Sequence, residues 1–117
     1  MSFLSETINV LSQHSKRVEQ VFWVGSKRGN YAISWDEFAA IADFDYDNGY
    51  GTAQIASDLV VVGGYWWLER HEYDGAEWWE YKESPAKQTN VNSFSRLYAR
   101  YGGTLDEINN PEDDEES

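Results

Sequence analysis

The sequence predicts an α+β fold, in which an antiparallel sheet of four or five strands, built from two hairpins, carries two or three short helices on one face. Three observations support this prediction. Runs of β-branched and aromatic residues alternate with glycine-containing turns, as in hairpins. Other stretches repeat apolar residues at helical spacing. The 117 residues include no cysteine, so a hydrophobic core has to hold the fold together without disulfides.

Three stretches are predicted to be helical. The first covers about residues 3–13, where leucine and isoleucine recur at i, i+4 and i+7. The second runs from about 35 to 43 and begins with a capping box, in which Ser34 and Glu37 each accept a hydrogen bond from the other's backbone amide. The third covers residues 93–101, which are followed by a glycine suited to a helix C-terminus.

Five runs rich in β-forming residues predict the strands. They are residues 18–24, 31–33, 59–62, 65–72 and 76–83. The glycine-flanked segment 25–29 is expected to join the first pair as a hairpin. Gly63 and Gly64 are expected to form the turn between the third and fourth strands, because glycine tolerates positive φ.

The turn of the last hairpin determines which side chains share a face. A two-residue turn at 74–75 would place two pairs of glutamates opposite each other, among them Glu69 and Glu80. Like charges directly opposite destabilise a sheet. We therefore expect a three-residue turn over 73–75, in which Gly75 adopts the left-handed conformation of a bulge.

The hairpin 65–83 is the first candidate binding surface, since it holds four of the six tryptophans and three of the eight tyrosines. In the expected register, Trp66 and Trp78 lie on one face and Trp67 and Trp79 on the other, which we expect to be buried. Exposed aromatic rings beside an arginine are typical of interface hot spots, and the arginine is expected to stack on Trp78. The candidate partner-binding residues of the hairpin are Tyr65, Trp66, Arg70 and Trp78.

Acidic residues form the second candidate surface. The chain carries a formal net charge of −12. Asp43, Asp45 and Asp47 fall in one predicted loop and are expected to dock on a basic surface of a partner protein. Residues 106–117 hold seven of the 21 acids and no base, which predicts a disordered acidic tail after a single domain of residues 1–105. Direct nucleic-acid binding is disfavoured, because it depends on Lys and Arg meeting phosphates.

Nothing in the sequence matches a catalytic motif, so we expect neither an enzyme nor a cofactor. The absence of cysteine excludes thiolate zinc sites, and the two histidines, His14 and His71, do not form a metal-binding or triad pattern. The aspartate loop resembles the start of an EF-hand, but Gly49 is one position late and Gln54 stands where glutamate is needed, so no metal is expected. No apolar run approaches the ~20 residues of a membrane helix, which favours a cytoplasmic protein without membrane contact.

The runs YAISWDEFAAIADFDYDNGYG and IASDLVVVGGYWWLERHEYDGAEWWEYK resemble small, acidic, uncharacterised proteins of bacteriophages and mobile elements, notably of actinobacterial hosts. The resemblance covers about residues 18–83 and implies no particular activity or site residue. In size, acidity and lack of catalytic groups, the chain is also similar to phage inhibitors of host defence, including anti-CRISPR and DNA-mimic proteins.

The sequence therefore predicts a small, acidic, non-enzymatic inhibitor or adaptor, encoded by a phage and acting in the host cytoplasm. Its carboxylates would occupy the basic, nucleic-acid-binding surface of a host or defence protein such as a CRISPR or restriction component. Two alternatives stay open. One is a structural or assembly protein whose aromatic residues form the core of a homodimer, and the other is a carbohydrate-binding module with tryptophan platforms.

Overall fold

The computed structural model describes residues 1–49 and 51–110, and it confirms the predicted α+β fold. The chain divides into two compact units, Met1–Pro85 and Ala86–Ser117. Residues 86–105, which the sequence analysis placed in the main domain, thus fall in the second unit. Within the described residues, no helix is long and apolar enough to cross a membrane.

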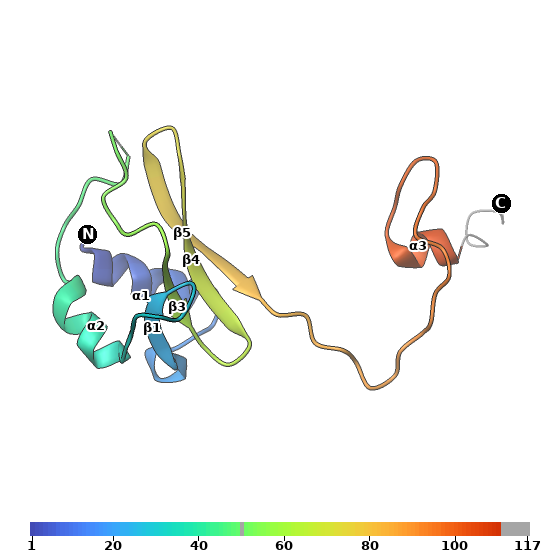
Figure 1. Cartoon of the computed structure of the whole chain (residues 1–117), viewed down its shortest axis with the longest axis horizontal. Coiled ribbons are helices and arrows are strands. Elements are labelled where there is room, and N and C mark those ends of the chain that lie inside the picture. The colour runs from blue at the N-terminus through green and yellow to red at the C-terminus, as the bar shows by residue number, and fades with distance from the viewer. Residues whose placement is uncertain (50, 111–117) are drawn as a thin grey trace. The chain divides into compact units, whose positions relative to one another are not determined.

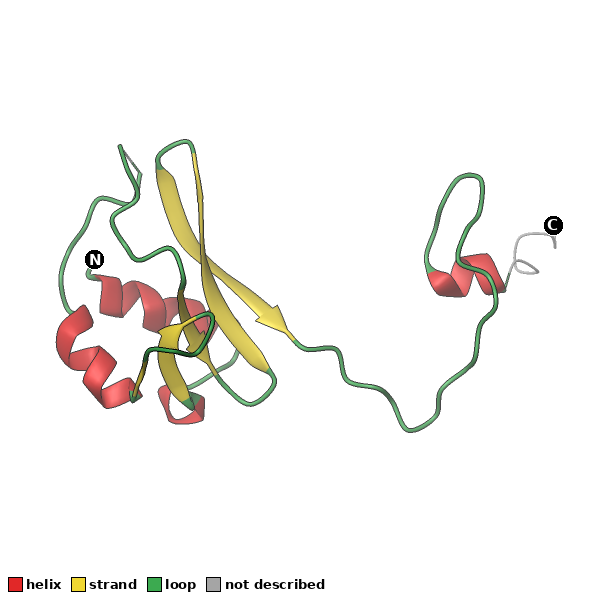
Figure 2. Cartoon of the chain, in the orientation of Figure 1, coloured by secondary structure: helices red, strands yellow, loops and turns green. Residues whose placement is uncertain are grey.

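The first unit is built on a five-stranded antiparallel sheet with the strand order β2-β1-β3-β4-β5 (Figure 1, Figure 2). The strands are β1 (Trp23–Ser26), β2 (Ala32–Ile33), β3 (Leu59–Val62), β4 (Trp66–Tyr73) and β5 (Ala76–Glu83). All five predicted strands are present. The first is shorter than expected, because residues 18–20 form a 3₁₀ turn, η1 (Val18–Gln20), before the chain enters the sheet.

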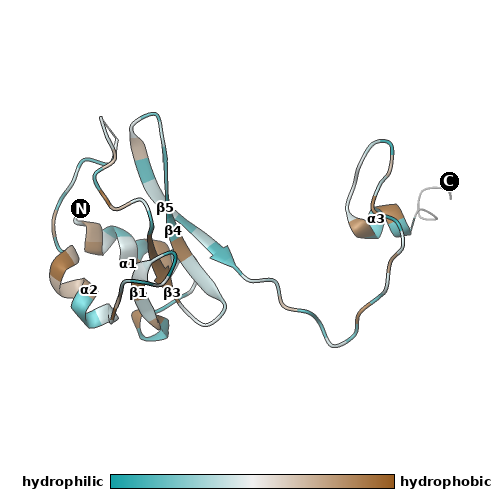
Figure 3. Cartoon of the chain, viewed as in Figure 1, coloured by the Kyte–Doolittle hydropathy of each residue, from teal (hydrophilic) through white to brown (hydrophobic). Residues whose placement is uncertain are grey.

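Two helices lie on one side of this sheet (Figure 2). Helix α1 (Phe3–Gln13) packs on β5, and the Phe3 ring stacks on Trp79 at 5.6 Å. Helix α2 (Trp35–Ala42) begins at the predicted capping box, in which Ser34 Oγ accepts from the Glu37 amide and the Glu37 carboxylate accepts from the Ser34 amide. Figure 3 shows that α2 is hydrophilic near its start and hydrophobic toward its end.

The predicted turn of the last hairpin is wrong. Strands β4 and β5 are joined by a two-residue turn, in which Asp74 and Gly75 both have positive φ (55° and 88°), and Glu69 does lie opposite Glu80. The repulsion is offset because Lys27 Nζ lies 3.4 Å from a Glu69 oxygen and Lys82 Nζ lies 3.4 Å from a Glu80 oxygen. The charge penalty of this register is therefore smaller than two bare carboxylates would cause.

A one-residue change of register exchanges the faces of one strand relative to the other. Trp66 and Trp79 consequently share the face that is covered by the helices, and both are buried. Trp67 and Trp78 share the opposite face. Burying Trp66, Leu68 and Trp79 in one core favours this register by several kcal/mol, since a fully buried large apolar side chain contributes about 1.5–3 kcal/mol.

The second unit contains one short helix, α3 (Leu105–Asn109), which starts at a capping box formed by Thr104 and Glu107. The predicted helix over 93–101 is absent, and the prediction of a wholly disordered tail from residue 106 is wrong at its start. The Asn109 side chain binds backbone groups of residues 95, 96 and 105, so the preceding chain is tied to α3 as a loop. The rest of the predicted tail, residues 111–117, lies outside the described residues.

Candidate protein-binding groove

An open apolar groove of about 520 Å³ lies in the first unit, on the face of the sheet that carries the helices. Its walls come from α2, the β1–β2 hairpin and the segment 54–59. The apolar side chains that line it are Phe3, Val24, Tyr31, Ile33, Phe38, Ile41, Phe44, Ile55 and Leu59. Clefts of this size that are mainly apolar, with few polar groups, are the usual form of a binding site.

The groove exists because the short helices cover only part of the sheet. Helix α1 packs on β5, while α2 covers β1 with little more than two turns. Phe38 of α2 is buried, but Ile41 is 68% exposed and Phe44, just after the helix, is 43% exposed. Phe38 and Ile41 share one face of α2 through their helical spacing, yet Ile41 has no cover, and the sequence analysis did not detect this.

Acidic residues occur among and beside the residues that line the groove. Residues 31–58 contain six acids and no base. Asp43, Asp45 and Asp47 are exposed as expected, and Phe44, which lines the groove, stands between the first two. Asp58 itself lines the groove. The structure thus joins the predicted acidic loop to an apolar depression that the sequence analysis did not detect.

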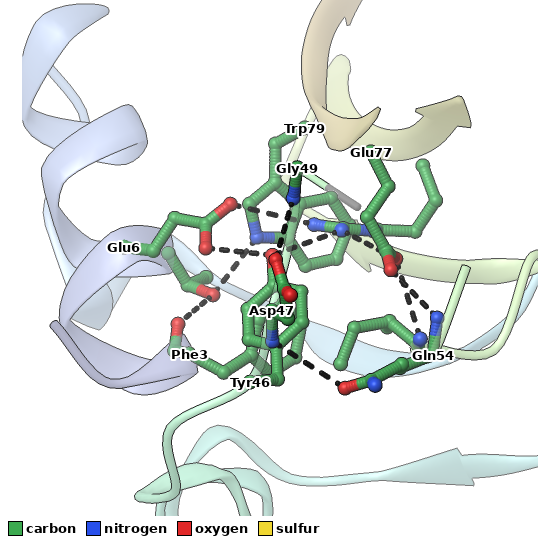
Figure 4. A network of polar contacts seen from close by, with 11 residues as sticks. Phe3, Glu6, Tyr46, Asp47, Gly49, Gln54, Glu77 and Trp79 are labelled. Atoms are coloured by element: carbon green, nitrogen blue, oxygen red, sulfur yellow. Dashed lines mark hydrogen bonds and ion pairs between the residues drawn. The ribbon is translucent and has the colours of Figure 1, made fainter. Parts of the chain in front are cut away.

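A buried ion pair supports one wall of the groove. Arg70 Nη2 lies 3.0 Å from Glu77 Oε1, and both side chains are 3% exposed. The Glu77 carboxylate also accepts hydrogen bonds from the backbone amides of Gln54 (2.6 Å) and Ile55 (3.2 Å) (Figure 4). These bonds tie the segment that contains the groove residue Ile55 to β5.

The same arginine supports the acidic loop. Arg70 Nη2 donates to the Tyr46 hydroxyl at 3.1 Å, and that hydroxyl donates to Glu6 Oε1 at 2.7 Å (Figure 4). Burial, together with the hydrogen bond to Glu6, raises the pKa of Tyr46 to about 12. The Phe3 amide donates to the Phe44 carbonyl, which is a second hydrogen bond between α1 and the acidic loop.

Arg70 is therefore an internal residue, and its predicted exposure as a partner contact stacked on Trp78 is wrong. Its guanidinium lies over the rings of Phe3 (5.2 Å) and Trp79 (4.8 Å) on the covered face of the sheet. Besides Glu77, it has Glu6 at 3.7 Å. Aromatic rings and carboxylates together compensate the buried charge, which would otherwise cost several kcal/mol.

The structure separates the other predicted contact residues. Trp66 is 2% exposed and belongs to the core, so its expected exposure is also wrong. Tyr65 and Trp78 are exposed, at 56% and 36%, but Trp78 projects from the face of the sheet opposite the helices and the groove. The aromatic hairpin and the acidic loop are consequently two distinct surfaces.

The groove is lined mainly by apolar side chains. Within residues 1–49 and 51–110, no three His, Asp or Glu side chains come together to hold a metal ion. The carboxylate of Asp47 accepts from the Gly49 amide at 3.1 Å, which stabilises its own turn. Comparison with family models, curated proteins and solved structures found no match to the chain.

Proposed function

We propose that this protein is a non-enzymatic inhibitor or adaptor that captures a basic segment of another protein in the apolar groove. The observation that carries the proposal is the position of Phe44, which lines the groove between the exposed carboxylates of Asp43 and Asp45. A segment that fills the groove with apolar side chains would bring neighbouring lysines or arginines to these carboxylates.

The two parts of the site have different roles. Apolar side chains of the partner would cover Ile41 and Phe44, and burial of apolar surface contributes about 25 cal/mol per Å². The acidic rim would steer the approach of a basic partner and fix its orientation more than it would add affinity. The supports from Arg70 and Glu77 hold the groove wall in place before binding, which lowers the entropic cost of association.

Basic segments with apolar anchors are common on proteins that bind nucleic acid. The partner class that we propose is a host or defence protein of this kind, such as a CRISPR or restriction component, and the protein itself is proposed to be phage-encoded. Occupying such a surface would block its nucleic acid, because both ligands need the same lysines and arginines.

Selection from a random peptide display library tests the proposal with the full chain as bait. Enriched peptides should contain at least two large apolar residues flanked by Lys or Arg. Their affinity should fall at least tenfold between about 0.1 M and 0.5 M salt, because the Debye length shrinks to a few Å. Enrichment of peptides without basic residues, or no enrichment at all, would contradict the proposed function.

A pair of isoleucine variants locates the binding. Ile41→Ser removes an exposed groove residue of α2 and should weaken the selected peptides at least tenfold, with an unchanged melting temperature. Ile8→Ser is the matched control, because Ile8 is an exposed isoleucine of α1 outside the groove lining. Equal binding by the two variants would rule out the groove as the site.

A further inference from the structure

The face of the sheet opposite the helices is the second uncovered surface of the first unit, and we call it the outer sheet face. Alternation along the paired strands places Trp23, Val62, Trp67 and Trp78 on it. Helices α1 and α2 both lie on the other side (Figure 1). An antiparallel sheet with one solvated face normally shows polar residues there, so three tryptophans on that face need an explanation.

The polar groups of the outer sheet face are already bonded to one another. One cluster centres on Glu69, whose carboxylate accepts from Trp67 Nε1 at 2.8 Å and contacts Lys27 Nζ at 3.4 Å and His71 Nε2 at 2.6 Å. These contacts, the Trp67 hydrogen bond first among them, lower the pKa of Glu69 to about 2. The carboxylate is therefore charged and paired at neutral pH.

A second cluster centres on Glu80. Its carboxylate accepts from Trp78 Nε1 at 3.1 Å, contacts Lys82 Nζ at 3.4 Å and lies 3.5 Å from His71 Nε2. His71 thus links the two clusters. Because these groups have partners within the protein, covering them costs less free energy than burying unpaired charges would.

The outer sheet face is also neutral, in contrast to the rest of the unit. It carries two carboxylates, Glu69 and Glu80, and two ammonium groups, Lys27 and Lys82. The remainder of residues 1–85 has twelve acids and four bases. Two copies that met through the outer sheet face would therefore bring no excess of like charge into the interface.

We propose that the outer sheet face binds the same face of a second copy, in a symmetric dimer. The charge balance favours this occupant, because two identical neutral faces do not repel each other, whereas a strongly acidic or strongly basic partner would meet no complementary net charge there. In a two-fold arrangement, the indoles of Trp67 and Trp78 from both copies form the centre of the interface, and the paired charges form its rim. This proposal does not depend on the groove.

Sedimentation equilibrium of the full chain, over about 5 µM to 1 mM, tests the dimer. The wild type should dimerise within this range, and Trp78→Ser should raise the dissociation constant at least tenfold, since it removes a central indole. The melting temperature of the variant at the lowest concentration checks that it is folded. Lys82→Ser provides a second variant at the rim, with a smaller effect of about two- to fivefold.

Ile41→Ser is the control that separates this surface from the groove, and it should leave the dimer intact. A wild type that stays monomeric up to 1 mM, or a dimer that Trp78→Ser leaves unchanged, would overturn the proposal. A dimer that only Ile41→Ser disrupts would assign self-association to the groove instead. If the wild type stays monomeric and binds soluble oligosaccharides, and Trp78→Ser does not bind them, the outer sheet face would instead be a carbohydrate-binding surface.

Discussion

The Arg70 guanidinium and the Glu77 carboxylate form an ion pair of 3.0 Å in which both side chains are 3% exposed. The pair joins the covered face of the β4–β5 hairpin to the segment 54–59, because Glu77 also accepts from the amides of Gln54 and Ile55. Arg70, which was predicted from the sequence as a partner contact, thus holds the groove wall in place together with Glu77.

The first prediction concerns this ion pair. Glu77→Ala should lower the free energy of unfolding by about 3–5 kcal/mol, because it leaves a buried guanidinium without its main partner. Urea unfolding of the variant measures the effect. Glu72→Ala is the matched control, since Glu72 is the exposed residue opposite Glu77 and should change stability by less than about 0.5 kcal/mol. Similar losses in the two variants would show that the buried pair does not stabilise the fold.

The second prediction tests the hairpin register. Trp66→Ala should cost about 3–5 kcal/mol through loss of a buried indole, whereas Trp78→Ala should cost about 1 kcal/mol or less. Thermal or urea unfolding of both variants at low protein concentration distinguishes them. A larger loss for Trp78 than for Trp66 would mean that the two strands pair one residue out of the register described here.

The third prediction concerns the turn between β3 and β4. A methyl group at residue 63 would overlap the ring of Trp66, and Gly63→Ala should therefore destabilise the protein by about 1–3 kcal/mol. The neighbouring Gly64→Ala should be nearly neutral, because its closest contact is the Phe22 ring at 3.7 Å. Equal unfolding midpoints for the two variants would contradict the packing of Trp66 against this turn.

The fourth prediction concerns pH. The pKa of Glu69 is lowered from 4.5 to about 2, mainly by the Trp67 hydrogen bond. A carboxyl group whose pKa is lower in the folded state than in the unfolded state stabilises the fold at pH values above its unfolded pKa. This contribution to the free energy of unfolding is lost as the pH falls through the folded-state pKa. We expect the free energy of unfolding to decrease as the pH is lowered from about 4.5 to 2. The variant Glu69→Gln should show a smaller decrease over the same range. Glu72→Gln, at an exposed position, should retain the decrease of the wild type.

The fifth prediction concerns the division of the chain. A fragment of residues 1–85 contains the complete sheet, both longer helices and the groove lining. It should fold cooperatively, with a melting temperature within a few degrees of that of the full chain. Circular dichroism during a thermal scan measures this. Loss of the transition in the fragment would show that the first unit depends on residues beyond Pro85.

Local features of the fold were predictable because their causes lie within a few residues of each other. Helix α2 starts where Ser34 and Glu37 form their reciprocal hydrogen bonds. A short connection with Gly63 and Gly64 does join β3 to β4, but the expected reason is wrong, because neither glycine has a positive φ. The exposure of Asp43, Asp45 and Asp47 followed in the same way from their place in a polar loop. The helix expected over 93–101 failed because apolar spacing alone does not supply a core to pack against.

By itself, the sequence determined the α+β class, the strands, the capped helix and the acidic loop, since propensity, spacing and capping act over short distances. Only the tertiary structure decided which faces of β4 and β5 are covered. That choice depends on the free energy of burying Trp66 and Trp79 in the core, and on the hydrogen bonds that Arg70 makes with Glu77 and Tyr46. The groove beside Phe44 likewise results from how little of the sheet α2 covers, which is a property of packing between distant segments rather than of any local pattern.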